Sequence, residues 1–278
     1  MSDLPHGLRA TKMATTGIFE ATALRVIHFL QQAFIIPRPQ SNHASTVRNK
    51  VSILPQRNII FNMRVLLIGG SGQTGRLVID EALQRGHKVT ALLRDPSALP
   101  AKEGLTIVKG TPLEPSNIES AFNAVPGDIP NAVIVTLSSP QEKGTRVMTN
   151  SHKNLIAAME RHGVSKITTL SSFGVGSSYP NITVLMRFAI SKTSLKHPFE
   201  DHNQVDETLK KSGVKFVLFR AARLTLANKA PVQFCGDDGK GLGVFAGLGG
   251  ISRASVAACM LDAVEKSTWD RSTPVIMN

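Results

Sequence analysis

The sequence predicts an α/β fold in which helices cover both faces of a doubly wound, mostly parallel sheet. Three observations lead to this prediction. A buried strand at 63–68 passes through a glycine-rich turn directly into an amphipathic helix. A second strand, rich in branched residues, follows at 88–93, and strands and helices alternate from there to the carboxyl end. Repeated units of this kind specify parallel strands with right-handed crossovers.

The first strand–helix–strand unit has the clearest pattern. Residues 63–68 form an apolar run broken only by Arg64, which is typical of a parallel strand buried on both faces. Apolar residues then recur with helical spacing up to Gly86, where a left-handed residue can end the helix. Residues 88–93 supply the second strand, so the unit has the length of an ordinary βαβ motif.

Three glycines mark the turn after the first strand. Gly69 permits the tight turn, Gly72 lets backbone N–H groups approach a diphosphate, and Gly75 lets the helix pack close to the sheet. The helix N-terminus adds free N–H groups and a partial positive charge. The alternative is a turn with a purely structural role. The cofactor-binding residues that we expect here are Gly69, Ser71, Gly72, Gln73, Thr74 and Gly75.

The end of the second strand indicates which dinucleotide would bind. An acidic residue there would accept hydrogen bonds from the ribose 2′-OH of NAD, but Arg94 occupies the place. A guanidinium can hold an added 2′-phosphate through charge-assisted bonds, which favours NADP(H). Asp95 could weaken this preference, and Arg76 is a second phosphate partner. The alternative is that Arg94 is a solvated residue at a strand end.

The remaining elements continue the alternation. We expect strands at 105–109, 132–137, 167–170, 215–219 and 274–277, and helices at 117–124, 146–162, 200–212 and 252–266. Two segments interrupt the rhythm. Residues 174–197 carry Arg187, Lys192 and Lys196 and form either a basic flap over a substrate or a solvated loop. Residues 236–250 are glycine-rich without phosphate-loop spacing, which predicts a mobile loop near the substrate.

Composition limits the classes of protein. The chain has 278 residues, of which 42% are hydrophobic and 19% charged, so wholesale disorder, collagen and a multi-span membrane protein are excluded. Two cysteines are too few for a disulfide scaffold or a four-ligand zinc site. The net charge of +12 suits an anionic partner. No DNA-binding motif is visible, and one Trp and one Tyr offer little stacking surface, so we expect no nucleic acid binding.

Residues 1–62 form a basic leader with seven Lys and Arg against two acidic residues. An Arg-bearing, acid-poor, amphipathic start is typical of a mitochondrial transit peptide. There are two alternatives to a transit peptide. The leader is a disordered tail, or it is an upstream stretch and the true start is Met63. The apolar stretch 17–36 is broken by polar residues, which argues against a transmembrane helix. We therefore expect a domain at 63–278 that is cytoplasmic, or mitochondrial if the leader is a transit peptide.

Four motifs resemble the atypical short-chain dehydrogenase/reductases, with the NmrA-like and flavin reductase/biliverdin reductase B group the most similar. They are residues 65–75, 92–95, 157–164 and 251–254. The resemblance implies a Rossmann-type doubly wound parallel sheet, NADP(H) as cofactor, and a small C-terminal substrate region formed mainly by 174–200 and 225–250. One departure is Gly110-Thr111, where the family commonly has Gly-Asp, so the contacts to adenine are left open.

The catalytic residues are harder to predict. The wider superfamily uses a Tyr with a Lys four residues later, but the single Tyr179 is followed at that spacing by Thr183. The resemblance implies that Ser171 lies beside the nicotinamide and that His202, in an Asp-His pair, is a second catalytic candidate. The alternatives are that Ser171 caps a strand end and that His202 is exposed where Asp201 caps a helix start.

Two functions are compatible with these features. The first is an NADPH-dependent oxidoreductase that transfers hydride to a planar carbonyl, quinone or flavin-like small molecule. The second is a non-catalytic NmrA-like NADP(H) sensor that acts through a protein partner. The missing Tyr and Lys favour the sensor, whereas Ser171 favours the oxidoreductase. We expect no metal and no integral membrane contact in either case.

Overall fold

The computed structural model describes residues 62–240, 242 and 249–278. These residues belong to the unit Asn58–Asn278. The predicted leader lies outside the described residues except for Asn62, and the predicted loop at 236–250 lies partly outside them. The predicted boundary between leader and domain therefore stays a prediction.

The predicted doubly wound sheet is confirmed. Eight strands follow the order β3-β2-β1-β4-β5-β6-β10-β8, and all neighbours are parallel except β10 and β8. Their bounds are β1 (Arg64–Ile68), β2 (Lys88–Leu93), β3 (Leu105–Lys109), β4 (Ala132–Val135), β5 (Lys166–Ser172), β6 (Lys215–Ala221), β8 (Gln233–Phe234) and β10 (Val275–Met277). Two short strands, β7 (Arg223–Thr225) and β9 (Gly250–Ser252), pair separately.

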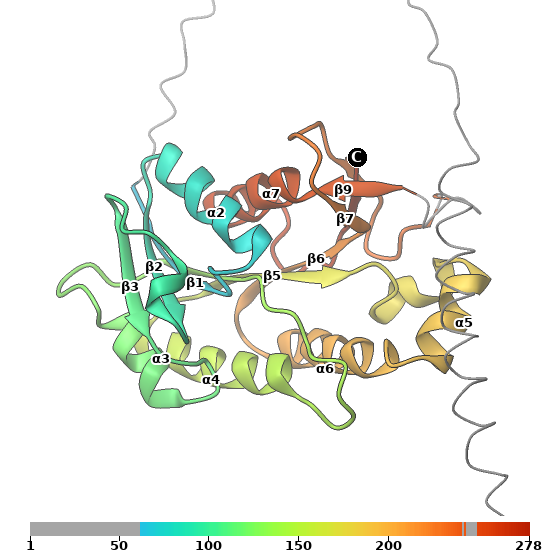
Figure 1. Cartoon of the computed structure of the whole chain (residues 1–278), viewed down its shortest axis with the longest axis horizontal. Helices are drawn as coiled ribbons and strands as arrows, with labels where there is room; N and C mark the ends of the chain where they lie inside the picture. The colour runs from blue at the N-terminus through green and yellow to red at the C-terminus, as the bar shows by residue number, and fades with distance from the viewer. Residues whose placement is uncertain (1–61, 241, 243–248) are drawn as a thin grey trace, which may run out of the picture. The chain divides into compact units, whose positions relative to one another are not determined.

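Helices cover both faces of the sheet, as Figure 1 shows. One face carries α2 (Gln73–Gln84) and α7 (Arg253–Glu265), and the other carries α3 (Pro115–Phe122), α4 (Val147–His162) and α6 (Lys196–Lys211). Beyond the end of β5 lie η2 (Gly176–Asn181) and α5 (Val184–Lys192), so the expectation of a solvated loop at 174–197 is wrong. Within the described ranges, no helix is both long and apolar enough to cross a bilayer.

The central strand β1 shows why its sequence suits this architecture. All five of its residues are buried. Because successive side chains point to opposite faces of a strand, Val65 and Leu67 enter the core beneath α2 and α7, whereas Leu66 and Ile68 enter the core beneath α3, α4 and α6. A run of apolar residues without polar alternation is therefore required here.

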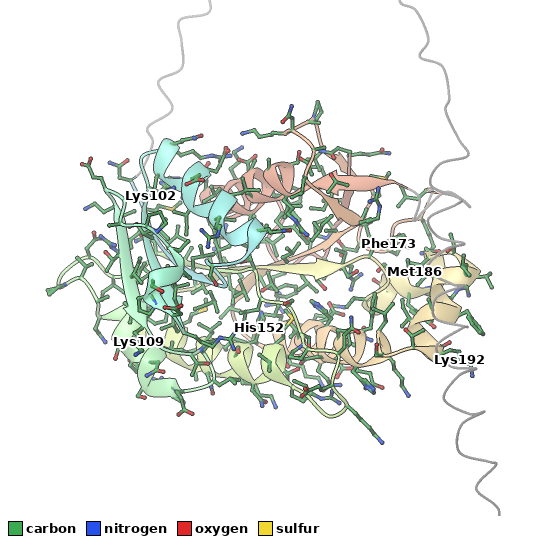
Figure 2. The ribbon with its side chains drawn as sticks, viewed as in Figure 1. Lys102, Lys109, His152, Phe173, Met186 and Lys192 are labelled. Carbon is green, nitrogen blue, oxygen red and sulfur yellow. The ribbon has the colours of Figure 1, made fainter. Side chains whose placement is uncertain are left out.

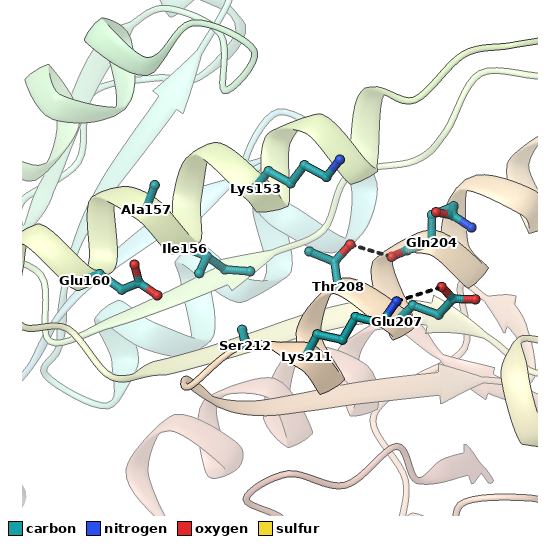
Figure 3. A pocket seen from close by; sticks show the side chains of 9 residues that line it. All are labelled: Lys153, Ile156, Ala157, Glu160, Gln204, Glu207, Thr208, Lys211 and Ser212. Atoms are coloured by element: carbon teal, nitrogen blue, oxygen red, sulfur yellow. Dashed lines mark hydrogen bonds and ion pairs between the residues drawn. The ribbon is translucent and has the colours of Figure 1, made fainter.

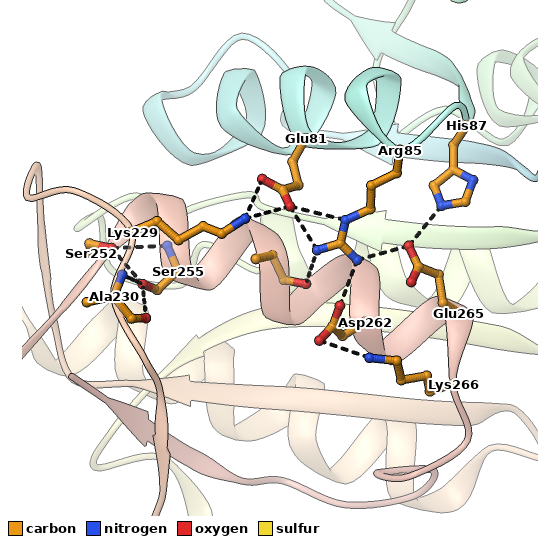
Figure 4. A network of polar contacts seen from close by, with 11 residues as sticks. Glu81, Arg85, His87, Lys229, Ala230, Ser252, Ser255, Asp262, Glu265 and Lys266 are labelled. Atoms are coloured by element: carbon orange, nitrogen blue, oxygen red, sulfur yellow. Dashed lines mark hydrogen bonds and ion pairs between the residues drawn. The ribbon is translucent and has the colours of Figure 1, made fainter. Parts of the chain in front are cut away.

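A guanidinium joins the two helices on the first face. Arg85 follows α2 and donates to Glu81 at 2.9 Å, to Asp262 at 2.6 Å and to Glu265 at 2.9 Å, the last two on α7 (Figure 4). The side chain of Arg85 is 23% exposed, so this cluster is partly shielded from water. It fixes α2, whose first turn faces the carboxyl edge of the sheet, against α7.

The order of the strands locates a crevice at that edge. The crossovers from β1 and β4 run toward opposite ends of the sheet, so the loops after these strands diverge. Open α/β sheets bind ligands at such a switch point. Thr136, directly after β4, donates through Oγ1 to the carbonyl of Gly69 at 3.1 Å and ties the two loops together.

We expect Arg85→Met to lower the free energy of unfolding by about 1–3 kcal/mol, because three carboxylates lose their shared donor. Urea denaturation followed by circular dichroism measures this. The matched control is Arg161→Met, which breaks an exposed pair with Glu119 and should cost less than about 1 kcal/mol. Equal losses in the two variants would contradict a special role for Arg85.

Candidate functional site

The glycine turn after β1 leaves no room for a side chain at Gly69 or at Gly75. Gly69 has φ +92°, and a Cβ there would lie 2.8 Å from Thr136 Oγ1. At Gly75 a Cβ would lie 2.2 Å from the carbonyl oxygen of Gly69. The absence of both side chains lets the first turn of α2 sit directly against the end of β1. The backbone is thereby held in a cradle that any Cβ would fill.

The N-terminus of α2 has no anionic group of its own. Gly72 is the N-cap, no side chain caps the helix, and the first turn contains no acidic residue. The first N–H groups of a helix have no acceptor within the helix. Those of Gln73 and Thr74 thus remain available to an anion, which the helix dipole also attracts. Ser71 precedes them with an exposed side chain.

Arg94 is exposed at the carboxyl end of β2, in agreement with either predicted role, as a partner of the 2′-phosphate or as a solvated residue. Its neighbour Asp95 is not within ion-pair distance of it, and the Asp95 carboxylate accepts two hydrogen bonds from Ser97 at 3.0 and 2.7 Å. The side chain and backbone of Ser97 lower the pKa of Asp95. The second candidate, Arg76, donates to the carbonyls of Ser71 and Ala98. These hydrogen bonds stabilise the glycine turn.

Sequence reasoning missed a third guanidinium at this edge. Arg253 is the first residue of α7, and its Nη1 lies 3.5 Å from Thr74 Oγ1 on α2. Its Nε is buried without a hydrogen-bond partner, and no carboxylate of the described residues lies within ion-pair distance. A cation at the positive end of a helix is unfavourable without an anion nearby. Residues 251–254 form one of the four motifs that resemble the family. The sequence does not reveal that Arg253 within this motif contacts Thr74 at the start of α2.

The structure brings the two predicted catalytic residues together. Ser171 lies near the end of β5 and is 5% exposed. Its Oγ is 3.3 Å from Nδ1 of His202 on α6. Burial lowers the pKa of His202 to about 4, so the imidazole is neutral at physiological pH. The pair stands at the same carboxyl edge of the sheet as the glycine turn.

Asp201 has a different role from the one expected. α6 begins at Lys196, so Asp201 does not cap its own helix and His202 does not open one. Asp201 is instead fully buried and accepts hydrogen bonds from the backbone N–H groups of Met148 and Thr149, both at 3.0 Å, in the first turn of α4. It caps that helix from another element. It also accepts from Ser139 Oγ at 2.7 Å, in the loop after β4.

This capping fixes the position of His202. Burial alone would raise the pKa of Asp201, but the hydrogen bonds from Thr149 and Ser139 hold it below its usual value. The carboxylate is therefore charged and locks α6 to α4 one residue before His202. No pattern in the sequence reveals a cap that comes from a residue about fifty positions away.

A buried histidine lies beside this pair. His152 on α4 is fully buried, with Nδ1 2.7 Å from the carbonyl of Met148 and Nε2 2.9 Å from Thr169 Oγ1 on β5 (Figure 2). The carbonyl can only accept, so Nδ1 carries the proton and Nε2 accepts from Thr169. Complete burial lowers the pKa of His152 to about 4. His152 thus joins α4 to the strand that bears Ser171.

The segments expected to bind substrate are anchored by one buried arginine. Arg220 on β6 is fully buried and donates to Ser177 Oγ at 2.7 Å, to the carbonyl of Asp237 at 2.5 Å and to Asp206 at 3.2 Å. A Cβ at Gly176 would lie 2.4 Å from this guanidinium. The start of η2 and the turn after β8 are therefore held against the end of β6.

One surface pocket in the described part of the chain lies away from these residues. It has a volume of about 460 Å³ and lies between α4 and α6 (Figure 3). Its walls are mostly polar or charged, with Lys153, Glu160, Glu207 and Lys211 among them. None of the predicted site residues lines it, and no cluster of metal-ligating side chains occurs among the described residues.

Comparisons with curated proteins give partial matches. A photosystem II assembly factor, Ycf39 from Synechocystis sp., is 28% identical over 125 residues, which are 44% of this chain and 37% of that protein. A 3-beta-hydroxysteroid dehydrogenase from Mycolicibacterium neoaurum is 30% identical over 119 residues, 40% of this chain and 32% of that protein. The chain thus spans about a third of the length of these relatives.

Solved structures match most of the described domain. ChuY, an anaerobilin reductase from Escherichia coli O157:H7, has a TM-score of 0.63 and 20% identity, covering 77% of this chain and 96% of its own. A wide-type short-chain dehydrogenase/reductase from Veillonella parvula, in complex with NADP, has a TM-score of 0.60 and 14% identity, covering 78% and 94%. At such identities the likeness shows the fold.

The family model described as NAD(P)H-binding matches residues 69–267, well over half of the chain. It begins at the first glycine of the turn after β1 and extends beyond the end of α7. The predicted nicotinamide cofactor and the predicted likeness to atypical short-chain dehydrogenase/reductases are confirmed at this level. The chain belongs to the NAD(P)H-binding family.

Proposed function

We propose that the protein is an NADPH-dependent oxidoreductase that transfers hydride to a planar carbonyl, quinone or flavin-like small molecule. The observation that carries this proposal is the 3.3 Å contact between Ser171 and the neutral His202 at the same sheet edge as the glycine turn. A protein that only binds the cofactor has no need of a partly buried hydroxyl–imidazole pair at this place.

The glycine turn fits the diphosphate of a dinucleotide. The cradle closed to any Cβ at Gly75 and the uncapped N–H groups at the start of α2 suit an anion of that size. We assign Arg253 to the same diphosphate, and Arg94 to the 2′-phosphate that distinguishes NADPH. When bound, the reduced nicotinamide supplies the hydride.

Ser171 and His202 would handle the proton. If Nδ1 of the neutral imidazole donates to Ser171 Oγ, the serine hydroxyl is free to give its proton to a substrate oxygen as negative charge develops there, and a proton from water then restores the serine hydroxyl. The capping of α4 by Asp201 holds the imidazole in place for this step. General acid catalysis of this kind contributes roughly 10²–10⁴ to the rate, and it takes the place of the missing tyrosine.

The second candidate is an NADP(H) sensor that acts through a protein partner. It is favoured by Tyr179, which is 38% exposed in η2 and has no lysine at the required spacing. Mixing the purified protein with NADPH and a panel of flavins, quinones and ketones, while following nicotinamide absorbance, separates the two. Turnover of any acceptor supports the oxidoreductase, and tight NADPH binding without turnover across the panel supports the sensor.

We expect Arg94→Gln to weaken NADPH binding by about 10- to 100-fold and to leave NADH binding nearly unchanged, because only the 2′-phosphate loses a charge-assisted partner. Arg253→Gln should weaken both cofactors by similar factors, because both carry the diphosphate. Titration calorimetry with each cofactor measures this, with Arg161→Gln as an exposed control. Equal losses for both cofactors in Arg94→Gln would remove its assigned role.

We expect Ser171→Ala to lower kcat about 10²-fold or more while the Kd for NADPH changes less than threefold. Because the folded-state pKa of His202 is about 4, the imidazole stays neutral as the pH falls from 8 to 5.5, and wild-type kcat should show no acidic limb in that range. A limb with a midpoint near 6.5 that disappears in His202→Gln would contradict the neutral imidazole. An unchanged kcat in Ser171→Ala would remove the serine from the mechanism.

A further inference from the structure

Helix α5 is apolar on two opposite sides. Its inner side carries Ile190, which is 5% exposed and packs in a small core with Phe173 at the end of β5. Its outer side carries Val184, Leu185 and Phe188, which are 74%, 48% and 61% exposed. A helix that is apolar all round is normally buried on every side. The outer side of α5 therefore calls for an apolar environment that the described part of the chain does not supply.

The spacing gathers the outer residues on one face. Val184, Phe188 and Lys192 are four positions apart and lie one above another along the helix, and Leu185 lies beside them. Met186, 37% exposed, extends the apolar surface toward the body of the protein. Figure 2 marks Met186 and Lys192 on α5, away from the central sheet. We call the side chains of 184, 185, 188 and 192 the outer face of α5.

The charge around this face has one sign. α5 contains Arg187 and Lys192 and no acidic residue. Among the described residues, neither has a carboxylate within ion-pair distance, whereas nearby Lys196 is paired with Glu200. Apolar side chains flanked by unpaired cations are typical of helices that lie in the plane of an anionic membrane surface.

The size of the face decides between a protein and a lipid partner. A stable protein interface needs roughly 800 Å² on each partner, and a nine-residue helix with three strongly exposed apolar side chains offers too little area. A bilayer requires no complementary shape. Each apolar side chain removed from water, and each cation near an anionic surface, strengthens such binding.

We propose that the outer face of α5 docks the protein on an anionic lipid surface. Val184, Leu185 and Phe188 enter the interface, and the exposed Lys192 of the same face contacts the phosphate headgroups. The contact is peripheral, in keeping with the absence of a spanning helix from the described residues. It does not depend on the proposed oxidoreductase function, since no residue of the outer face belongs to the cofactor site or to the Ser171–His202 pair.

Co-sedimentation of the full chain with vesicles tests the proposal. Vesicles of equal parts phosphatidylglycerol and phosphatidylcholine should bind the wild type, and pure phosphatidylcholine should bind it at least tenfold more weakly. Phe188→Ser should lower binding to the anionic vesicles at least tenfold. The matched control is Leu226→Ser, which removes an equally apolar side chain that is 79% exposed after β7, and it should bind like the wild type.

The substitution at 188 leaves the net charge of +12 unchanged. If the basic leader or the overall charge alone caused binding, Phe188→Ser would bind like the wild type, and the proposal would be overturned. It would also be overturned if the wild type stayed in the supernatant with anionic vesicles. A third contrary result is a wild type that is a dimer on gel filtration and becomes a monomer in Phe188→Ser, because a second copy of the chain would then cover the outer face. Calorimetry with NADPH, unchanged in Phe188→Ser, separates these outcomes from any failure of the cofactor site.

A spectroscopic readout locates the contact directly. The chain has one tryptophan, Trp269, which stacks on Phe234 and can be replaced by Phe. In the double variant Trp269→Phe, Phe188→Trp, brominated lipid in anionic vesicles should quench most of the fluorescence. In Trp269→Phe, Leu226→Trp it should quench little. Equal quenching in the two variants would show that α5 has no preferred contact with the lipid.

Discussion

The backbone N–H groups at the start of α2 are the feature on which the rest of the site depends. They are available because Gly72 caps the helix without a side chain and because the first turn contains no carboxylate. They point to the switch point of the sheet because Gly75 lets the helix approach the end of β1. An anion held there orients the rest of a dinucleotide along the carboxyl edge, toward β2 on one side and β5 on the other.

A buried carboxylate and its neighbours fix the Ser171–His202 pair relative to the glycine turn. Asp201 joins α6 to the first turn of α4 and to the loop after β4, and Thr136 joins that loop to the glycine turn. His152 fastens α4 to β5 through Thr169. Because the contacts of Asp201 with α4 and of His152 with β5 are buried, and the contacts of Ser139 and Thr136 are partly buried, the Ser171–His202 pair is positioned by rigid elements, as a proton-donating group requires.

The parts of the fold that local patterns determine could be predicted. The bounds of β2 and β3 are those expected from the sequence, because branched apolar runs flanked by turns define parallel strands well. The glycine turn after β1 could be predicted equally well. The start of α6 was not, because the Asp that seemed to cap it caps α4 through a tertiary contact. Arg253 and Arg220 were missed for the same reason: their partners lie far away in the sequence.

The central claim is that main-chain amides at the start of α2 bind the cofactor diphosphate. The most direct measurement is amide NMR during titration with NADPH, with free adenosine as a ligand that lacks the diphosphate. The largest NADPH-induced shifts should fall on the amides of Gln73 and Thr74, whereas adenosine should leave both unmoved. Bound NADPH with these two amides unshifted would show that the diphosphate binds elsewhere.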